Sequence, residues 1–143
     1  MNIVAEEKRI PAMSRKSIEK VRELEQQLLS MPQVEIKTEH AFHAGLYART
    51  IKIPAGCALS GAEITVDTVL ILSGHATMAV DGGSVELDGY HVIQASAQRK
   101  QAFIAHSDTY LTMIFHTKAS TVEDAENEFT NEPNMLGSRR ERI

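Results

Sequence analysis

Short apolar runs at close spacing, separated by glycine-containing turns, constrain the fold of this chain most strongly. The runs lie at 46–53, 59–72, 76–80, 84–87, 90–93, 102–105 and 110–116. Several of them alternate apolar and polar residues, which is the period of a β-strand. No helical pattern separates consecutive runs, so the crossover helices that a parallel sheet needs are missing. The spacing therefore predicts an antiparallel sandwich or barrel.

Glycine and proline mark the predicted turns. Asp81-Gly82-Gly83 is a strong hairpin signal. Gly74 and Asp88-Gly89 are interpreted as further turns, and Pro54-Ala55-Gly56 closes the run at 46–53. An additional strand is predicted over Val34–Thr38, where apolar residues alternate with charged ones.

Helices are predicted on both sides of the strands. Ser14 stands where an N-cap would, and a helical pattern continues to about Ser30. Its apolar side chains share one face: Ile18, Val21, Leu24, Leu28 and Leu29. This helix either packs on its own domain or mediates contact with another chain. Ser120 and Glu123 have the form of a capping box, which predicts a short acidic helix to about Phe129.

The chain of 143 residues is long enough for one domain with its own core. We expect an N-terminal arm and amphipathic helix over 1–32, a barrel over 33–118, and a short acidic helix and basic tail over 119–143. In the arm, Ile3–Ala5 can add an edge strand. The tail carries Arg139, Arg140 and Arg142, and it is either a solvated end or a docking segment for an acidic partner surface.

Composition narrows the function classes. The net charge of −4 disfavours nucleic-acid binding through a basic surface. No apolar run approaches the roughly 18 residues of a membrane span, so no membrane partner is expected. Cys57 is the only cysteine, which excludes an intrachain disulfide and is consistent with the cytoplasm.

The segment from Ile53 to about Thr117 resembles the cupin superfamily. The features that carry the resemblance are Pro54–Gly56, Val69–Gly74, Met78–Gly82 and Val85–Gly89. Their order is similar to the family's succession of a proline–glycine turn, an apolar strand ending in glycine, and two strands ending in Asp-Gly. The resemblance implies a mainly β, single-domain, cupin-like jelly-roll β-barrel with an N-terminal helix and a short C-terminal helix.

The chain also looks like the small cupin-like proteins of tailed bacteriophages and prophages. Met31–Glu35, Gly45–Arg49, Ala105–Thr109 and His116-Thr117 carry this second resemblance. It implies a viral or prophage origin, with a role as a virion accessory or inside the infected bacterial host. The expected location is the host cytoplasm or the virion.

Metal-binding cupins place histidines and a glutamate on two motifs. In this sequence, the resemblance puts the paired histidine positions among 60–63, the glutamate position at Asp67 and the third histidine position at Lys100. None of these positions holds a histidine, so we predict no metal ligand and no cofactor. Glu63, Asp67 and Lys100 remain, either as a structural pairing in which Lys100 neutralises a carboxylate, or as a metal-free acid/base pocket.

A second set of acid/base candidates lies on the last strand. Tyr110 and His116 alternate on one face, and His91 could join them if that face lines the barrel. Sugar epimerases of this fold class use such a set.

The leading functional hypothesis is a non-catalytic binding or structural module. It would act by self-association as a homo-oligomer and by binding a protein partner, such as a head or tail component of a virion. Two enzyme alternatives stay open. One is a small-molecule isomerase, epimerase or lyase that uses the candidates above, and the other is a metal-dependent cupin enzyme.

Overall fold

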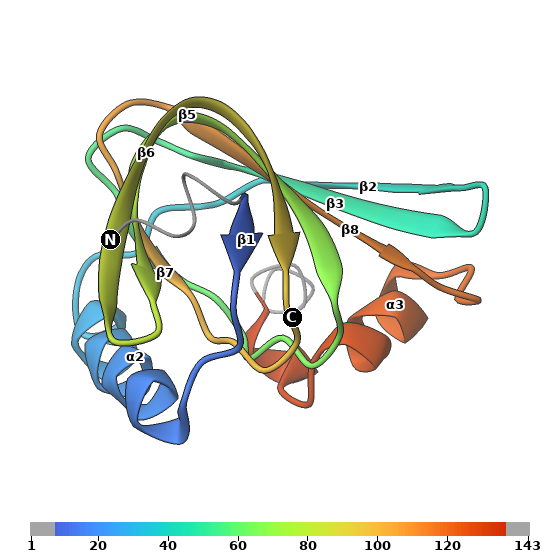
Figure 1. Cartoon of the computed structure of the whole chain (residues 1–143), viewed down its shortest axis with the longest axis horizontal. Helices are drawn as coiled ribbons and strands as arrows, with labels where there is room; N and C mark the ends of the chain where they lie inside the picture. The colour runs from blue at the N-terminus through green and yellow to red at the C-terminus, as the bar shows by residue number, and fades with distance from the viewer. Residues whose placement is uncertain (1–7, 137–143) are drawn as a thin grey trace.

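The computed structural model describes residues 8–136 and confirms a mainly β fold with a helix near each end of the chain (Figure 1). Its elements are β1 (Arg9–Ile10), α2 (Arg15–Leu29), β2 (Thr38–His43), β3 (Leu46–Ile53), β4 (Ala58–Ser60), β5 (Thr68–Val80), β6 (Gly83–Ala95), β7 (Ala102–Ala105), β8 (Thr109–His116), α3 (Val122–Phe129) and a 3₁₀ turn, η1 (Pro133–Met135). Ile3–Ala5 and the arginines of the tail lie outside the described residues.

The β5–β6 hairpin organises the sheet. Asp81 and Gly82 form its two-residue loop, as predicted, and β6 returns antiparallel along all of β5. The first half of β5, Val69–Ser73, pairs with β8, whereas Ala76–Met78 pairs with β7. The strand order is β1-β6-β5-β8-β3-β2, with β4 attached through β7. One hairpin therefore belongs to two layers, and Figure 1 shows it arching over the top of the barrel.

Gly74 and Gly89 lie in the middle of these long strands, so the prediction that each marks a turn is wrong. They pair with each other across the hairpin, with φ of 145° and 95°. Backbone of this conformation bends a strand without ending it, and it favours glycine. The glycines therefore mark the place where the hairpin passes from one layer to the other.

Two other boundaries differ from the sequence prediction. Residues 31–37 form no strand, and β2 begins only at Thr38. Apolar and charged residues alternate over 34–38, but residues 34–37 have no neighbouring strand to pair with. Thr38–His43, by contrast, pairs along its whole length with β3. The cap of α3 is Thr121, whose side chain accepts a hydrogen bond from the amide of Asp124, and not Ser120.

Alternating side chains of the strands point into the barrel interior. The buried inner residues are Tyr47 and Ile53 of β3, Leu70, Leu72, Ala76 and Met78 of β5, Leu87 and Ile93 of β6, Phe103 and Ala105 of β7, and Leu111, Met113 and Phe115 of β8. This core is largely aliphatic because the chain is poor in aromatic residues, at 5%.

The apolar side chains of helix α2 pack against the barrel only in its first half, whereas Glu25 is the buried residue of its second half. Ser14 caps the helix as predicted, and its backbone amide donates to Asp81 of the hairpin loop at 2.9 Å. Ile18 and Val21 are buried, but Leu24 is 38% exposed. The helix therefore packs on its own domain over its N-terminal turns and leaves Leu24 and Leu29 of its C-terminal turns exposed.

Candidate functional site

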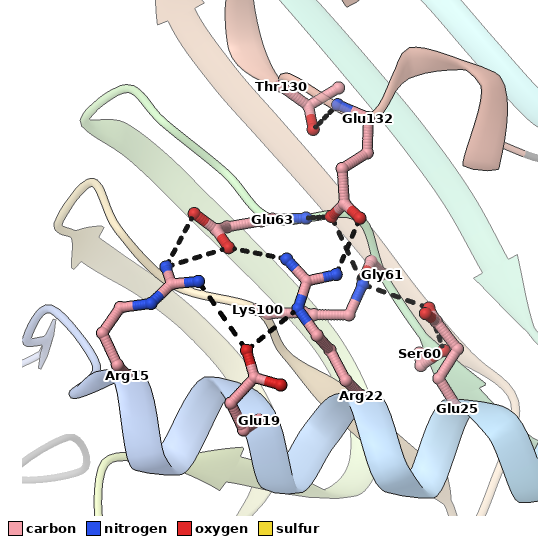
Figure 2. A network of polar contacts seen from close by, with 10 residues as sticks. All are labelled: Arg15, Glu19, Arg22, Glu25, Ser60, Gly61, Glu63, Lys100, Thr130 and Glu132. Atoms are coloured by element: carbon pink, nitrogen blue, oxygen red, sulfur yellow. Dashed lines mark hydrogen bonds and ion pairs between the residues drawn. The ribbon is translucent and has the colours of Figure 1, made fainter.

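A buried lysine lies at the centre of a charged network between α2 and the barrel (Figure 2). Lys100 is fully buried, and its Nζ donates to the carbonyl of Gly61 at 2.8 Å. The same nitrogen lies 3.1 Å from Oε2 of Glu25 on α2 and 3.6 Å from Oε1 of Glu132. Lys100 thus neutralises carboxylates, as one of the two sequence-based interpretations predicted, but its partners are not Glu63 or Asp67.

Glu63 and Asp67 are held by other groups. Glu63 forms ion pairs with Arg15 at 3.2 Å and with Arg22 at 3.0 Å, both from α2. Asp67 accepts a hydrogen bond from the backbone amide of Ala97 at 2.7 Å. Each carboxylate therefore joins two segments of the fold, and the three candidates do not converge on one point.

Glu132 connects the C-terminal segment to this network. Its carboxylate accepts from Arg22 at 2.8 Å and from the backbone amide of Glu63 at 3.0 Å. Burial raises the pKa of Glu132, but the hydrogen bonds from Arg22 and Glu63, together with the charge of Lys100, outweigh burial and hold the pKa below its usual range. The same hydrogen bond raises the pKa of Arg22. Glu132 is accordingly an anion at neutral pH.

The donor set at the expected metal position does not suit a transition metal. Lys100 is a cation that already contacts two carboxylates, and Asp67 accepts from the backbone. Across residues 8–136, no group of three or more His, Cys, Asp or Glu side chains is arranged to hold a metal ion. The residues that are present therefore do not fit the metal of the catalytic cupins.

The second candidate set is divided between the two faces of the sheet, because His91 pairs with the inward-facing Leu72 whereas Tyr110 and His116 face outward. Tyr110 and His116 are exposed on β8, because the inward positions of this strand are Leu111, Met113 and Phe115. His91 contacts Lys8, with 2.6 Å between Nδ1 and Nζ, and the carbonyl of Asp88. The acid/base set required that this face of β8 line the barrel, and it points outward instead. Alternation alone could not have decided the direction.

The barrel encloses a cavity of about 760 Å³ that opens beside the C-terminal end of α2. Its inner wall is mainly apolar and includes Ile51, Ile64, Leu70, Phe103, Leu111 and Met113. At its edge are Leu29, Met31, Val34 and Met135, all of which are exposed apolar residues. This size is within the usual range of small-molecule sites.

Polar side chains also line the cavity, among them Arg49, Arg99 and Gln101. Arg49 forms an ion pair with the fully buried carboxylate of Glu126 at 3.1 Å. Arg99 and Gln101 flank Lys100 in sequence but point into the barrel, and both are buried. Sequence reasoning missed all three. It also missed Glu25, although Glu25 follows Ile18 by seven residues and Val21 by four, which places it on the buried face of α2.

Comparisons with known proteins bear on the fold. No family model matches the sequence, and no curated protein matches it. A cupin superfamily protein from Desulfitobacterium hafniense DCB-2 has a similar structure, with a TM-score of 0.50 and 18% identity over 64% of this chain and 86% of that chain. KdgF from Halomonas sp. also has a similar structure, with a TM-score of 0.49 and 15% identity over 62% of this chain and 86% of that chain.

A Cupin_2 domain of an XRE family transcriptional regulator from Enterobacter cloacae gives a TM-score of 0.48 and 13% identity, over 59% of this chain and all of that chain. At such low identity, the likeness to the first of these proteins shows the fold alone. The chain is a cupin-like jelly-roll β-barrel with two small helices, as the sequence predicted.

Neither helix in the described range 8–136 has the length and apolar character needed to span a membrane.

Proposed function

We propose that this protein is a non-catalytic binding module on a cupin-like barrel, which acts by self-association and by binding a partner. The observation that carries the proposal is an uncharged outer face on three neighbouring strands, defined by Val69, Ile71, Tyr90, Val92, Tyr110 and Ile114 and called here the outer face. These residues are adjacent in the sheet. Ile71 lies beside Val92, Val69 lies beside Ile114, and Tyr90 and Tyr110 flank Ser73.

The outer face is exposed to an extent that is unusual for apolar residues. Tyr90 is 66% exposed, Tyr110 49%, Val92 47% and Val69 41%. The side chains that complete the face, Ser73, Gln94 and Thr112, are also uncharged. Contiguous apolar surface without charge is typical of interaction sites, and a depletion of charge is the signal that marks the core of an interface.

A second copy of the chain is the occupant that this face fits best. The outer face has tyrosines towards one end and aliphatic residues towards the other. None of its own residues is charged, and Lys52 of β3 borders it beside Tyr110. A self-complementary patch of this kind suits a two-fold interface, in which both copies contribute the same patch.

The charged groups support the non-catalytic part of the proposal. Lys100, Glu63 and Asp67 all contact other parts of the fold, so none of them presents a free acid or base to the cavity. An isomerase or epimerase would need those groups to converge within hydrogen-bond reach of a substrate.

The mass in solution tests the proposal. Light scattering at tens of micromolar should give a multiple of the mass of a single chain, because an apolar face of this size would be buried between copies. A single-chain mass at that concentration would contradict self-association. Stoichiometric iron, manganese, nickel or zinc in protein purified without a chelator would contradict the non-catalytic assignment.

The finer proposal, a bacteriophage or prophage accessory protein, rests on the sequence resemblance. The neighbourhood of the gene that encodes this protein tests the phage proposal. A position among head and tail genes supports a virion accessory, a position among early genes supports a role in the infected host cell, and a position far from any phage gene contradicts both.

A further inference from the structure

One positive charge at the cavity forms no ion pair with any carboxylate of residues 8–136. Arg99 is one of the residues that line the cavity, and it is only 1% exposed. No carboxylate oxygen of residues 8–136 forms an ion pair with it, in contrast to Arg22, Arg49 and Lys100. A buried charge without a counterion is costly, and native proteins rarely retain one without a reason.

Neutral groups accept three hydrogen bonds from the guanidinium of Arg99, which leaves two of its N–H donors without a partner among the described residues. Its Nε donates to Gln101 at 3.0 Å, Nη1 to the carbonyl of Ser96 at 2.6 Å, and Nη2 to the hydroxyl of Thr68 at 2.7 Å. A guanidinium has five N–H donors. Each terminal nitrogen therefore keeps a second N–H, for which no described residue is an acceptor.

The charge of Arg99 persists at neutral pH. Burial lowers its pKa to about 10, and the negative charge of Asp67 opposes this effect only in part. The cavity thus offers a fixed cation with two spare donors, held rigidly by three hydrogen bonds, in surroundings where an ion pair is stronger than in water.

The other charges of the cavity are already balanced or lie at its rim. Arg49 is paired with Glu126, and Glu25 with Lys100. Glu35 lines the opening and is exposed. One uncompensated positive charge remains inside, which matches a single negative charge; a dianion would leave a second charge buried and unpaired.

We propose that the barrel cavity binds a small monocarboxylic acid with an apolar body, whose carboxylate pairs with the guanidinium of Arg99. The body of the acid packs against Leu70, Leu111 and Met113, and the exposed apolar rim near Met31 and Val34 is its entrance. This site does not depend on self-association, so the failure of either proposal leaves the other intact.

The test compares octanoate with octanamide, which has the same chain but no charge, by isothermal titration calorimetry on the wild-type protein. Octanoate should bind at least about tenfold more tightly, because a hydrogen-bonded charge pair in a buried site contributes more than about 1.4 kcal/mol. Inorganic phosphate should bind more weakly than octanoate, since it has no apolar body. Equal affinity for acid and amide, or no binding of octanoate at millimolar concentration, would overturn the proposal.

The single cysteine reports where the acid binds. Cys57 lines the cavity and is partly buried. Bound octanoate should slow its reaction with the neutral reagent 4,4′-dithiodipyridine, and octanamide at the same concentration should slow it less. An unchanged rate under saturating octanoate would place binding elsewhere and contradict the proposal.

Substitution of the arginine gives the matched comparison. Arg99→Met should remove the preference for acid over amide, and Arg99→Lys should retain part of it. Arg15→Met, which removes a solvent-exposed arginine outside the cavity, should leave the preference unchanged. If Arg99→Met does not fold, the comparison of acid and amide on the wild-type protein decides alone. Retention of the full preference in folded Arg99→Met would overturn the assignment of Arg99.

Discussion

At Gly74, strand β5 passes so close to the beginning of β8 that there is no room for a side chain. A Cβ at this position would lie 2.5 Å from Oγ1 of Thr109, 2.7 Å from its Cα and 2.8 Å from the carbonyl oxygen of Asp108. Two of these atoms belong to the backbone, so they cannot move aside without shifting a strand. Gly89 shares the positive φ but has open space around it.

This difference between two paired glycines gives a prediction. Gly74→Ala should lower the free energy of unfolding by more than about 2 kcal/mol, since it adds a backbone clash to the conformational strain. Gly89→Ala should cost about 1 kcal/mol, from strain alone. Urea unfolding followed by far-UV circular dichroism measures both, and equal losses would show that the close approach to Thr109 is not limiting.

Lys100 gives a second prediction at the residue scale. Lys100→Met should cost roughly 3 kcal/mol of stability, because Glu25 is left buried without its cation. Adding Glu25→Met should recover much of this loss, since the buried charge is then gone. A double-mutant cycle by chemical denaturation measures the coupling. Additive losses would contradict the pairing of these two residues.

At the scale of elements, salt bridges attach helix α2 and the segment around η1 to the barrel and to each other. The carboxylate of Glu132 contacts Arg22 of α2 and lies near Lys100. Its folded-state pKa is below the ordinary value of 4.5. A carboxyl with a lowered pKa contributes stability above its ordinary pKa and loses that contribution as the pH falls through the folded value. Acid should therefore loosen this attachment.

The acid dependence can be measured against a matched variant. Between about pH 6 and pH 3, the urea midpoint of the wild-type protein should fall more than that of Glu132→Gln, which has no proton to gain at this position. The two curves should approach each other at the acid end. Parallel curves over the whole range would mean that Glu132 is not held as an anion by these contacts.

The sequence predicted those elements whose signals are local. Strand β3 and the loop of the β5–β6 hairpin were placed correctly because alternation and Asp-Gly act over a few residues. The bend at Gly74 was mistaken for a turn, since its cause lies in β8. The partners of Lys100 were missed for the same reason: Glu25 and Glu132 come from segments that only the folded chain brings to the barrel.

At the scale of the whole molecule, the barrel has two distinct surfaces. Its inner cavity is lined by apolar residues around Arg99, and its outer face is uncharged across β6, β5 and β8. The sequence predicted the cupin-like fold and proposed self-association, but it could not tell which side of each strand points inward. Because Tyr110 points outward, it is part of the outer face and not a candidate catalytic group.

A matched pair of surface variants tests the central claim, that the outer face is an interface between copies of this chain. Val92 and Ile104 are exposed to nearly the same extent, 47% and 50%, but Val92 belongs to the outer face, whereas Ile104 lies on β7 outside it. Measured by light scattering, Val92→Lys should have the mass of a single chain, and Ile104→Lys should keep the oligomeric mass of the wild-type protein. An oligomeric mass for Val92→Lys that equals the wild-type mass would contradict the claim.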